Sequence, residues 1–192
     1  MELLKDCALR FENLTNYKYH FIIGRKGKSE EFNLVFSKSD FHHLAGLHKL
    51  RDNDAIRTSE REQIFNSILN GDITEEKLKK SDFFDEVVNR LPSLVKLEEL
   101  LDSNKLIFHF SDKSDPTTRI NADYILKCID DSGTVFVFII EDNRNMRCVS
   151  QFPMNKKDYS QFQAKYTLLI KEKIDKNNNK IVFSYRNPTY KE

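Results

Sequence analysis

Tryptophan is absent from the 192-residue chain, and cysteine is scarce, with Cys7, Cys128 and Cys148 far apart. An odd number of distant cysteines fits reduced thiols better than a disulfide framework or a zinc site. No run approaches the roughly 18 apolar residues that span a bilayer, and the N-terminus lacks the basic-then-apolar order of a secretion signal. We therefore expect a cytoplasmic protein that does not enter a membrane.

The short motifs of several enzyme classes are also missing. The sequence has no glycine-rich phosphate-binding loop before a helix, no nucleophile elbow and no paired-carboxylate motif, which counts against nucleotide-binding, serine-hydrolase and glycosidase functions. His42 and His43 precede His48 by six and five residues, whereas a metal-binding pair on a helix needs an i, i+4 spacing. We expect no metal and no other cofactor.

A formal net charge of +1 gives no overall attraction to nucleic acid. The charge is uneven along the chain, because residues 72–102 carry nine acidic and five basic side chains while residues 165–192 carry seven basic and three acidic ones. This pattern fits either a polyanion-binding C-terminal region or two solvated faces without a partner.

Hydrophobic periodicity indicates a single domain over residues 1–192, with a tail at 187–192 that we expect to be disordered. A helix is predicted over 3–14, followed by a hairpin with strands at 17–23 and 31–36. The middle of the chain is predicted to be helical, with helices starting at Ser39 or Asp40, at a capping box over 59–62, at Thr74, at Ser81 and at Pro92.

From residue 105 the hydrophobic period changes to two, which predicts consecutive antiparallel strands. Residues 134–140 are apolar on both faces and indicate a central strand covered on both sides. Residues 166–174 fit either a helix or a strand before a last strand at 181–185. The four strands of the predicted sheet cover 105–110, 119–129, 134–140 and 147–152.

The segment from Phe41 to Leu47 reads Phe-His-His-Leu-Ala-Gly-Leu and contains the pattern Phe-x-His-Leu-x-Gly-Leu. A Phe-rich helical middle, Ala-Asp-Tyr-Ile-Leu at 122–126, an apolar strand and Ser-Gln-Phe at 150–152 follow in that order. In these features the chain resembles the fourth subfamily of phage-associated Barnase/EndoU/colicin/RelE-like nucleases, over roughly residues 17–175.

The resemblance implies an α+β fold, in which a helical N-terminal and middle part packs on an antiparallel sheet of about four strands, with the N-terminal hairpin added. It also implies RNA cleavage without a metal, on the open face of the sheet. Active-site residues vary within the superfamily, so only His43, Leu44, Gly46 and Ser150 carry over by position. His42 beside His43 leaves the reactive imidazole ambiguous.

RNA cleavage by transesterification needs a base for the 2′-hydroxyl, cations for the charge on the phosphorane and an acid for the leaving 5′-oxygen. Histidine suits the acid and base roles because its unperturbed pKa lies near neutrality. We select His43, with His109 as the next imidazole, and take His20 and His48 as structural or exposed. A helix-cap or core role is the alternative for His43.

Strand alternation suggests where the phosphate contacts lie. If the strands at 105–110 and 119–129 pair with their polar sides together, His109, Arg119 and Lys127 form a cationic face. Its alternative is the solvent side of a half-buried sheet. Ser150 is a further phosphate contact in this hypothesis, and Tyr124 is assigned to substrate binding.

The hairpin turn between residues 24 and 29 carries Arg25, Lys26 and Lys28, which form a basic tip suited to an RNA backbone or simply a solvated turn. The leading hypothesis is a metal-independent endoribonuclease of phage or mobile-element origin, with RNA as substrate. A toxin role and a cognate inhibitor protein are candidates, and the oligomeric state is open. The alternatives are a non-catalytic RNA- or protein-binding module and a small phage/host interaction protein.

Overall fold

The computed structural model describes residues 2–112 and 118–191. Its strands are β1 (Tyr17–Arg25), β2 (Lys28–Val35), β3 (Leu106–His109), β4 (Tyr124–Asp130), β5 (Gly133–Asp142), β6 (Asn145–Pro153), β7 (Ala164–Asp175) and β8 (Ile181–Arg186). They form one eight-stranded sheet in the order β1-β2-β6-β5-β4-β3-β7-β8. A further pairing of β1 with β7 closes every strand except β8 into a barrel.

The prediction of a sheet of about four strands packed on helices, with a separate N-terminal hairpin, is wrong. The hairpin is part of the barrel wall, because β2 pairs in parallel with β6 through Leu34 and Val35, and β1 pairs antiparallel with β7. Residues 166–174, which fitted a helix or a strand, belong to β7, which also contacts β3 and β8. Closure joins Tyr17 to Asp175, and a local hydrophobic period carries no information about such a distant partner.

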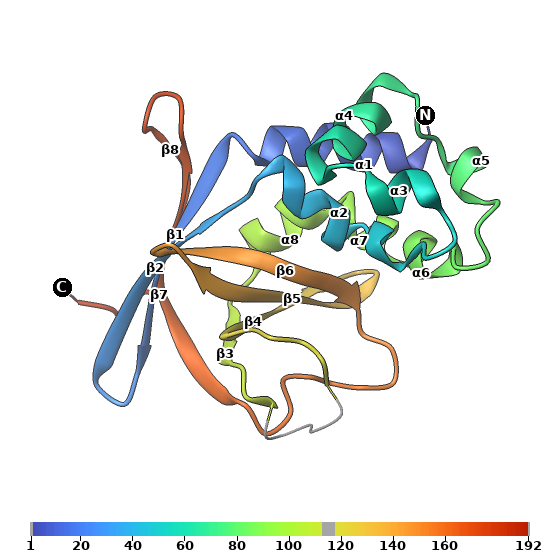
Figure 1. Ribbon diagram of the computed structural model, residues 1–192. Coiled ribbons are helices and arrows are strands. Elements are labelled where there is room, and N and C mark those ends of the chain that lie inside the picture. Colours follow the sequence, from blue (N-terminus) through green and yellow to red (C-terminus); the bar gives the residue numbers. More distant parts are fainter. Residues whose placement is uncertain (1, 113–117, 192) are drawn as a thin grey trace.

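Short helices fill the chain between β2 and β3. They are η1 (Lys38–Asp40), α2 (Phe41–Leu44), η2 (Leu47–Lys49), α3 (Asp54–Thr58), α4 (Arg61–Asn70), α5 (Glu75–Leu78), α6 (Asp85–Val88), α7 (Leu91–Leu94) and α8 (Leu97–Ser103), and one further helix, α1 (Leu3–Leu14), precedes β1. Figure 1 shows them gathered along one side of the barrel, with α2 and α7 next to β6. None of the helices in the described ranges is both long and apolar enough to cross a membrane.

Several elements match the sequence and others differ in detail. The helices predicted at 3–14 and after Ser59 are confirmed as α1 and α4, although Glu60 is the N-cap of α4 and no side chain caps it. The hairpin turn is shorter than predicted, because Lys26 and Gly27 both take positive φ and close a two-residue loop. The strand predicted at 119–129 begins only at Tyr124.

Two hydrophobic cores lie on opposite faces of β5. Val135 belongs to the main core, which joins the barrel to the helices, whereas Phe136 and Phe138 belong to a smaller aromatic core. Tyr159, from the segment between β6 and β7, packs edge-on against both phenylalanines. The prediction that residues 134–140 form a strand covered on both sides is therefore confirmed.

Candidate active site

A pocket of about 760 Å³ lies between the short helices and the strands β5 and β6. We call it the arginine pocket. Residues from the segment before β4 and from the segment between β6 and β7 complete its wall. Its ionisable lining, apart from Cys148 and Tyr159, consists of Asp40, His43, His48, Lys49, Arg61, Arg90, Arg119 and Arg147.

The helical side of the pocket depends on a tight turn after α2. Ser37 and Asp40 form a capping box at the start of η1, and Gly46 then ends α2 with φ of +78°. A Cβ atom at Gly46 would lie 2.9 Å from Cδ of Arg90 and 3.0 Å from the carbonyl oxygen of Glu86. The turn places the ring of His48 4.7 Å, centre to centre, from that of His43.

The sheet side of the pocket depends on a β-bulge in β6. Phe138 pairs with Ser150 and Ile139 pairs with Cys148, so Val149 has no partner on β5. The extra residue reverses the alternation of faces, and Ser150 therefore lines the pocket while the next residue, Gln151, is fully buried. Without the bulge, Ser150 would share the buried face of Cys148.

Gln151 ties the two sides of the pocket together. Its Nε2 donates hydrogen bonds to the carbonyl oxygens of Leu44 (3.1 Å) and Arg90 (3.2 Å), and its Oε1 accepts one from Ser93 (2.8 Å). The guanidinium of Arg90 lies over the ring of Phe152, with 5.6 Å from Cζ to the ring centre. These contacts hold both α2 and Arg90 against β6.

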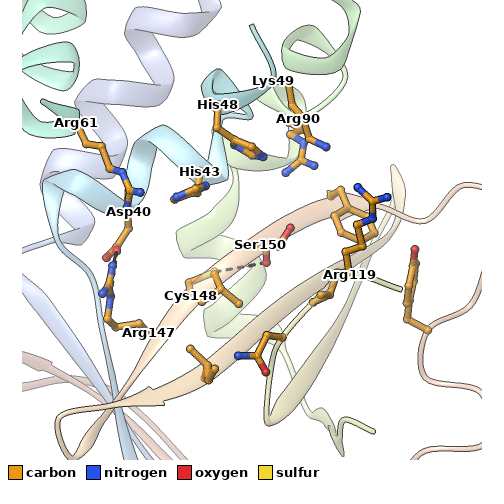
Figure 2. A pocket seen from close by; sticks show the side chains of 16 residues that line it. Asp40, His43, His48, Lys49, Arg61, Arg90, Arg119, Arg147, Cys148 and Ser150 are labelled. Atoms are coloured by element: carbon orange, nitrogen blue, oxygen red, sulfur yellow. Dashed lines mark hydrogen bonds and ion pairs between the residues drawn. The ribbon is translucent and has the colours of Figure 1, made fainter. Parts of the chain in front are cut away.

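The pocket is strongly cationic, because one lysine and four arginines face a single carboxylate, Asp40. Arg147 donates to Asp40 (2.5 Å) and Asp142 (2.8 Å), and these hydrogen bonds raise the pKa of Arg147. Neither Arg61 nor Arg119 pairs with a carboxylate in the described part of the chain. Figure 2 shows His43 and Ser150 between the Asp40–Arg147 pair and Arg119. Such a site favours an anion.

The imidazoles of His43 and His48 are neutral at neutral pH. The His48 side chain is exposed in part, but desolvation by its neighbours is the main cause that lowers its pKa to about 4, and the charge of those neighbours adds to the effect. Burial followed by the positive charge of Arg61 also lowers the pKa of His43, against an opposing effect of Asp40. A neutral imidazole has a free nitrogen lone pair and accepts a proton. A bound phosphate would move both pKa values upward.

The structure brings three of the selected residues together. His43, Arg119 and Ser150 line the arginine pocket, although Arg119 reaches it from the segment before β4 and not from a strand. His109 is elsewhere, with its ring centre 5.7 Å from that of Tyr124. Lys127 is bound to Asp158 (2.7 Å). The cationic face expected from His109, Arg119 and Lys127 is therefore not assembled.

The remaining selected residues lie apart from the pocket. The hydroxyl of Tyr124 donates to the carboxylate of Glu30. Arg25, Lys26 and Lys28 line a separate shallow pocket at the hairpin tip. All three cysteines are free and buried, and burial raises the pKa of Cys148 well above its usual value.

Sequence reasoning missed most of the cationic lining. Arg61, Arg90 and Arg147 were not selected, and His48 was taken as structural or exposed. The one local signal was the glycine of the Phe-x-His-Leu-x-Gly-Leu pattern, since a glycine that close after two histidines marks a chain reversal. No local signal marks Arg90, which reaches the pocket from the turn between α6 and α7.

A family model described as phage-Barnase-EndoU-ColicinE5/D-RelE like nuclease 4 (PBECR4) matches residues 3–187. The chain belongs to this nuclease family. The resemblance inferred from residues 41–47 and from the order of the segments that follow them is thereby confirmed, and the protein is a phage-associated nuclease. No curated protein and no solved structure matches the chain.

Proposed function

We propose that this PBECR4 protein is an endoribonuclease that cleaves RNA in the arginine pocket through attack of the 2′-hydroxyl, without a metal ion. The proposal is supported by a single pocket, which is lined by a half-buried imidazole, a serine hydroxyl and two arginines, Arg61 and Arg119, that have no carboxylate partner among the described residues. The family supplies the reaction class, which is cleavage of a nucleic acid.

His43 is the base in this reaction. Its neutral ring takes the proton of the 2′-hydroxyl, and the resulting oxyanion attacks the adjacent phosphorus. The bond from phosphorus to the 5′-oxygen then breaks, and that oxygen takes a proton from solvent. The products are a 2′,3′-cyclic phosphate on one fragment and a 5′-hydroxyl on the other.

The arginines stabilise the charge that grows on the phosphorane oxygens. Arg61 and Arg119 are free to contact these oxygens, whereas Arg147 is held in place by Asp40 and Asp142. Ser150 offers a hydroxyl donor from β6, between these charges. Fixed guanidinium groups thus supply the electrostatic stabilisation that a metal ion supplies in other nucleases.

RNA is the proposed substrate because an imidazole that acts as a base needs a hydroxyl group from which it can take a proton. RNA carries that nucleophile next to the scissile phosphate, and DNA does not. A substrate in which a single nucleotide keeps its 2′-hydroxyl would therefore be cut only after that nucleotide.

The decisive experiment uses purified protein, excess chelator and an oligonucleotide with one ribonucleotide in a deoxy background. We expect cleavage after the ribonucleotide with a 2′,3′-cyclic phosphate end, identified by mass spectrometry, and no cleavage of the all-deoxy control. A strict need for added divalent metal, or equal cleavage of the all-deoxy strand, would contradict the proposal. RNA that binds without being cut would favour a non-catalytic RNA-binding module.

A further inference from the structure

Three histidine rings converge at the helical side of the arginine pocket. His42, His43 and His48 each offer a ring nitrogen, and these three nitrogens lie within 4.8 Å of one another. The spacing of the three histidines counts against a metal site only if they lie on one continuous helix. The chain is not one helix here, because the left-handed turn at Gly46 folds η2 back toward α2.

His42 carries a buried ring nitrogen whose hydrogen-bonding capacity is not used. The residue is 8% exposed, and its Nδ1 has no hydrogen-bond partner among the residues that the structure describes. A metal-binding histidine uses one ring nitrogen as the ligand, and its imidazole must be neutral to bind. A buried polar nitrogen without a partner is unusual and calls for a ligand or ion.

The distances suit an imidazole-preferring ion after a small adjustment. Two nitrogens bound to tetrahedral zinc at about 2.05 Å lie about 3.4 Å apart. The three nitrogens therefore need to approach one another by up to about 1.4 Å, and rotation of the exposed His48 side chain and of the half-buried His43 side chain can contribute to this approach. Imidazole ligands select Zn²⁺, Co²⁺, Ni²⁺ and Cu²⁺ over Mg²⁺ and Ca²⁺.

We propose that His42, His43 and His48 form a binding site for Zn²⁺ or a similar transition-metal ion, and that the bound ion switches the nuclease off. The ion is an inhibitor and not a cofactor, because it occupies the nitrogen lone pair of His43 that would accept the 2′-hydroxyl proton. This second part rests on the proposed function; the binding site does not.

The positive charge of the arginine pocket repels a metal cation. The affinity of the histidine site for the ion therefore depends on the arginines beside it. Arg61 places positive charge near both His42 and His43, and Arg90 near both His43 and His48. We therefore expect Arg61→Gln to tighten metal binding. The matched change Arg57→Gln, at an exposed arginine that pairs with Asp54, should leave metal affinity unchanged.

The binding test uses Co²⁺ alone, added to metal-free protein without RNA. We expect one equivalent to give the visible absorption of tetrahedral Co²⁺ and to be displaced by Zn²⁺. His48→Ala should weaken binding at least tenfold, and so should His42→Ala; if His42→Ala does not fold, the exposed His48 still decides the question. The double variant His20→Ala/His109→Ala removes the two remaining histidines and should bind normally.

Loss of the Co²⁺ signal in the His20→Ala/His109→Ala variant, or its survival in folded His48→Ala, overturns the site. The inhibitory role is tested separately with the single-ribonucleotide substrate, for which one equivalent of Zn²⁺ should abolish cleavage and chelator should restore it. Stimulation by Zn²⁺ overturns the inhibitory role. If metal-free protein binds Co²⁺ as expected but never cuts RNA, the proposed function fails and the metal site stands.

Discussion

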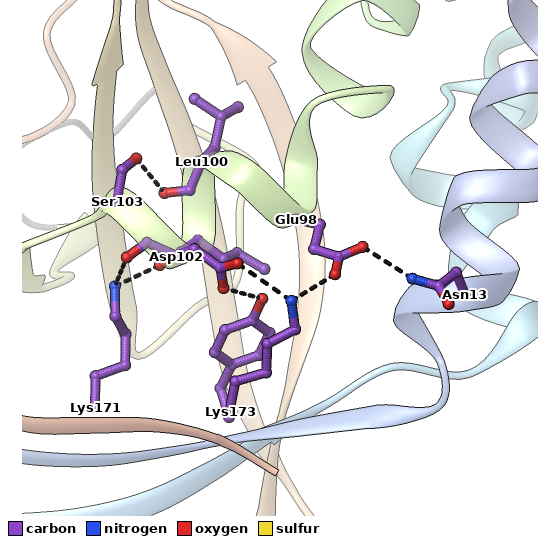
Figure 3. A network of polar contacts seen from close by, with 9 residues as sticks. Asn13, Glu98, Leu100, Asp102, Ser103, Lys171 and Lys173 are labelled. Atoms are coloured by element: carbon purple, nitrogen blue, oxygen red, sulfur yellow. Dashed lines mark hydrogen bonds and ion pairs between the residues drawn. The ribbon is translucent and has the colours of Figure 1, made fainter. Parts of the chain in front are cut away.

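Two clusters of basic side chains in this protein have opposite surroundings. Beside α8, Lys171 is 1% exposed and its Nζ donates to the carbonyl oxygens of Leu101 (2.5 Å), Asp102 (2.6 Å) and Asn104 (2.8 Å). All three of its donors are therefore used. Lys173, two residues along β7, binds Glu98 (2.5 Å) and the Asp102 carboxylate, as Figure 3 shows.

In the arginine pocket, by contrast, Arg61 and Arg119 have no carboxylate partner in the described part of the chain. The hydrogen bonds of the two lysines beside α8 hold the C-terminal end of this helix on β7. Their ammonium groups are therefore already paired within the fold. Arg61 and Arg119 remain available for an anion from solution. The partners of a cation, more than its presence, therefore separate a structural role from a binding role.

Removal of a buried lysine beside α8 should lower the stability of the protein but leave its cleavage activity unchanged. Burial lowers the pKa of Lys171 to about 8, so the group is still protonated at neutral pH and can use all three donors. Lys171→Met leaves three buried carbonyl oxygens without this donor and should lower the free energy of unfolding by about 2–4 kcal/mol. Urea denaturation measures this loss, while cleavage per folded molecule should not change.

The exposed Lys180 in the turn before β8 provides the control for Lys171→Met. Lys180→Met should change stability by less than about 0.5 kcal/mol. Equal losses in the two variants would show that the three carbonyl contacts contribute no stability.

Removing the imidazole of the pocket should have the converse effect. His43→Ala should reduce cleavage about 100-fold or more while the melting temperature changes little, because the side chain is half-buried and its loss removes a proton acceptor. Expression of the active protein should be toxic to a bacterial host, and His43→Ala should relieve that toxicity. Initial rates and melting curves separate these effects.

His109→Ala is the control for His43→Ala, since His109 lies outside the pocket. It should retain activity. A stable, fully active His43→Ala protein would remove His43 from the reaction and leave His109 as the next imidazole to test.

Substitution of two glycines by alanine distinguishes the effect of backbone strain on stability from the effect of a displaced pocket residue on cleavage. Gly46 and Gly27 have nearly equal φ of +78° and +76°, but a Cβ at Gly46 meets Arg90 while a Cβ at Gly27 meets nothing within 4 Å. Both changes to alanine should therefore lower stability by about 1 kcal/mol or more. Only Gly46→Ala should also slow cleavage, because it displaces Arg90. Equal cleavage rates in the two folded variants would show that the position of Arg90 does not matter.

A single unpaired arginine should have a smaller effect than His43. Arg119→Ala should slow cleavage about tenfold and reduce the salt slope of RNA binding by about one phosphate contact. Binding titrations at several salt concentrations measure the slope. Arg57→Ala, at an arginine paired with Asp54, should alter neither value. An unchanged slope in Arg119→Ala would place the RNA backbone elsewhere.

The hairpin tip should matter least for the chemical step, because it lies apart from the arginine pocket. Joint replacement of Arg25, Lys26 and Lys28 by alanine should weaken RNA association and flatten its salt dependence by up to about three phosphate contacts. The single-turnover rate at saturating RNA should stay the same. An unchanged salt slope would make the tip an ordinary turn.

Hydrophobic periodicity predicted those helices and strands whose formation depends mainly on neighbouring residues. Helix α1, helix α4 and strands β3, β5 and β6 follow from hydrophobic period, and the apolar faces of residues 134–140 correctly indicated cover on both sides. The predicted sheet failed at closure. Both edges were misjudged because the hairpin at β1 and β2 looks complete by itself, and because β7 closes the barrel by pairing with β1, which is more than a hundred residues away in the sequence.

The candidate site divides in the same way. By itself the sequence determined the family pattern at residues 41–47, the imidazole of His43 and the glycine that must follow it, because these depend on neighbouring residues. Only the tertiary structure decided that Arg90, Arg119 and Ser150 meet that imidazole. The physical reason is that their meeting depends on the bulge in β6 and on the packing of helices against it, which are interactions between distant segments.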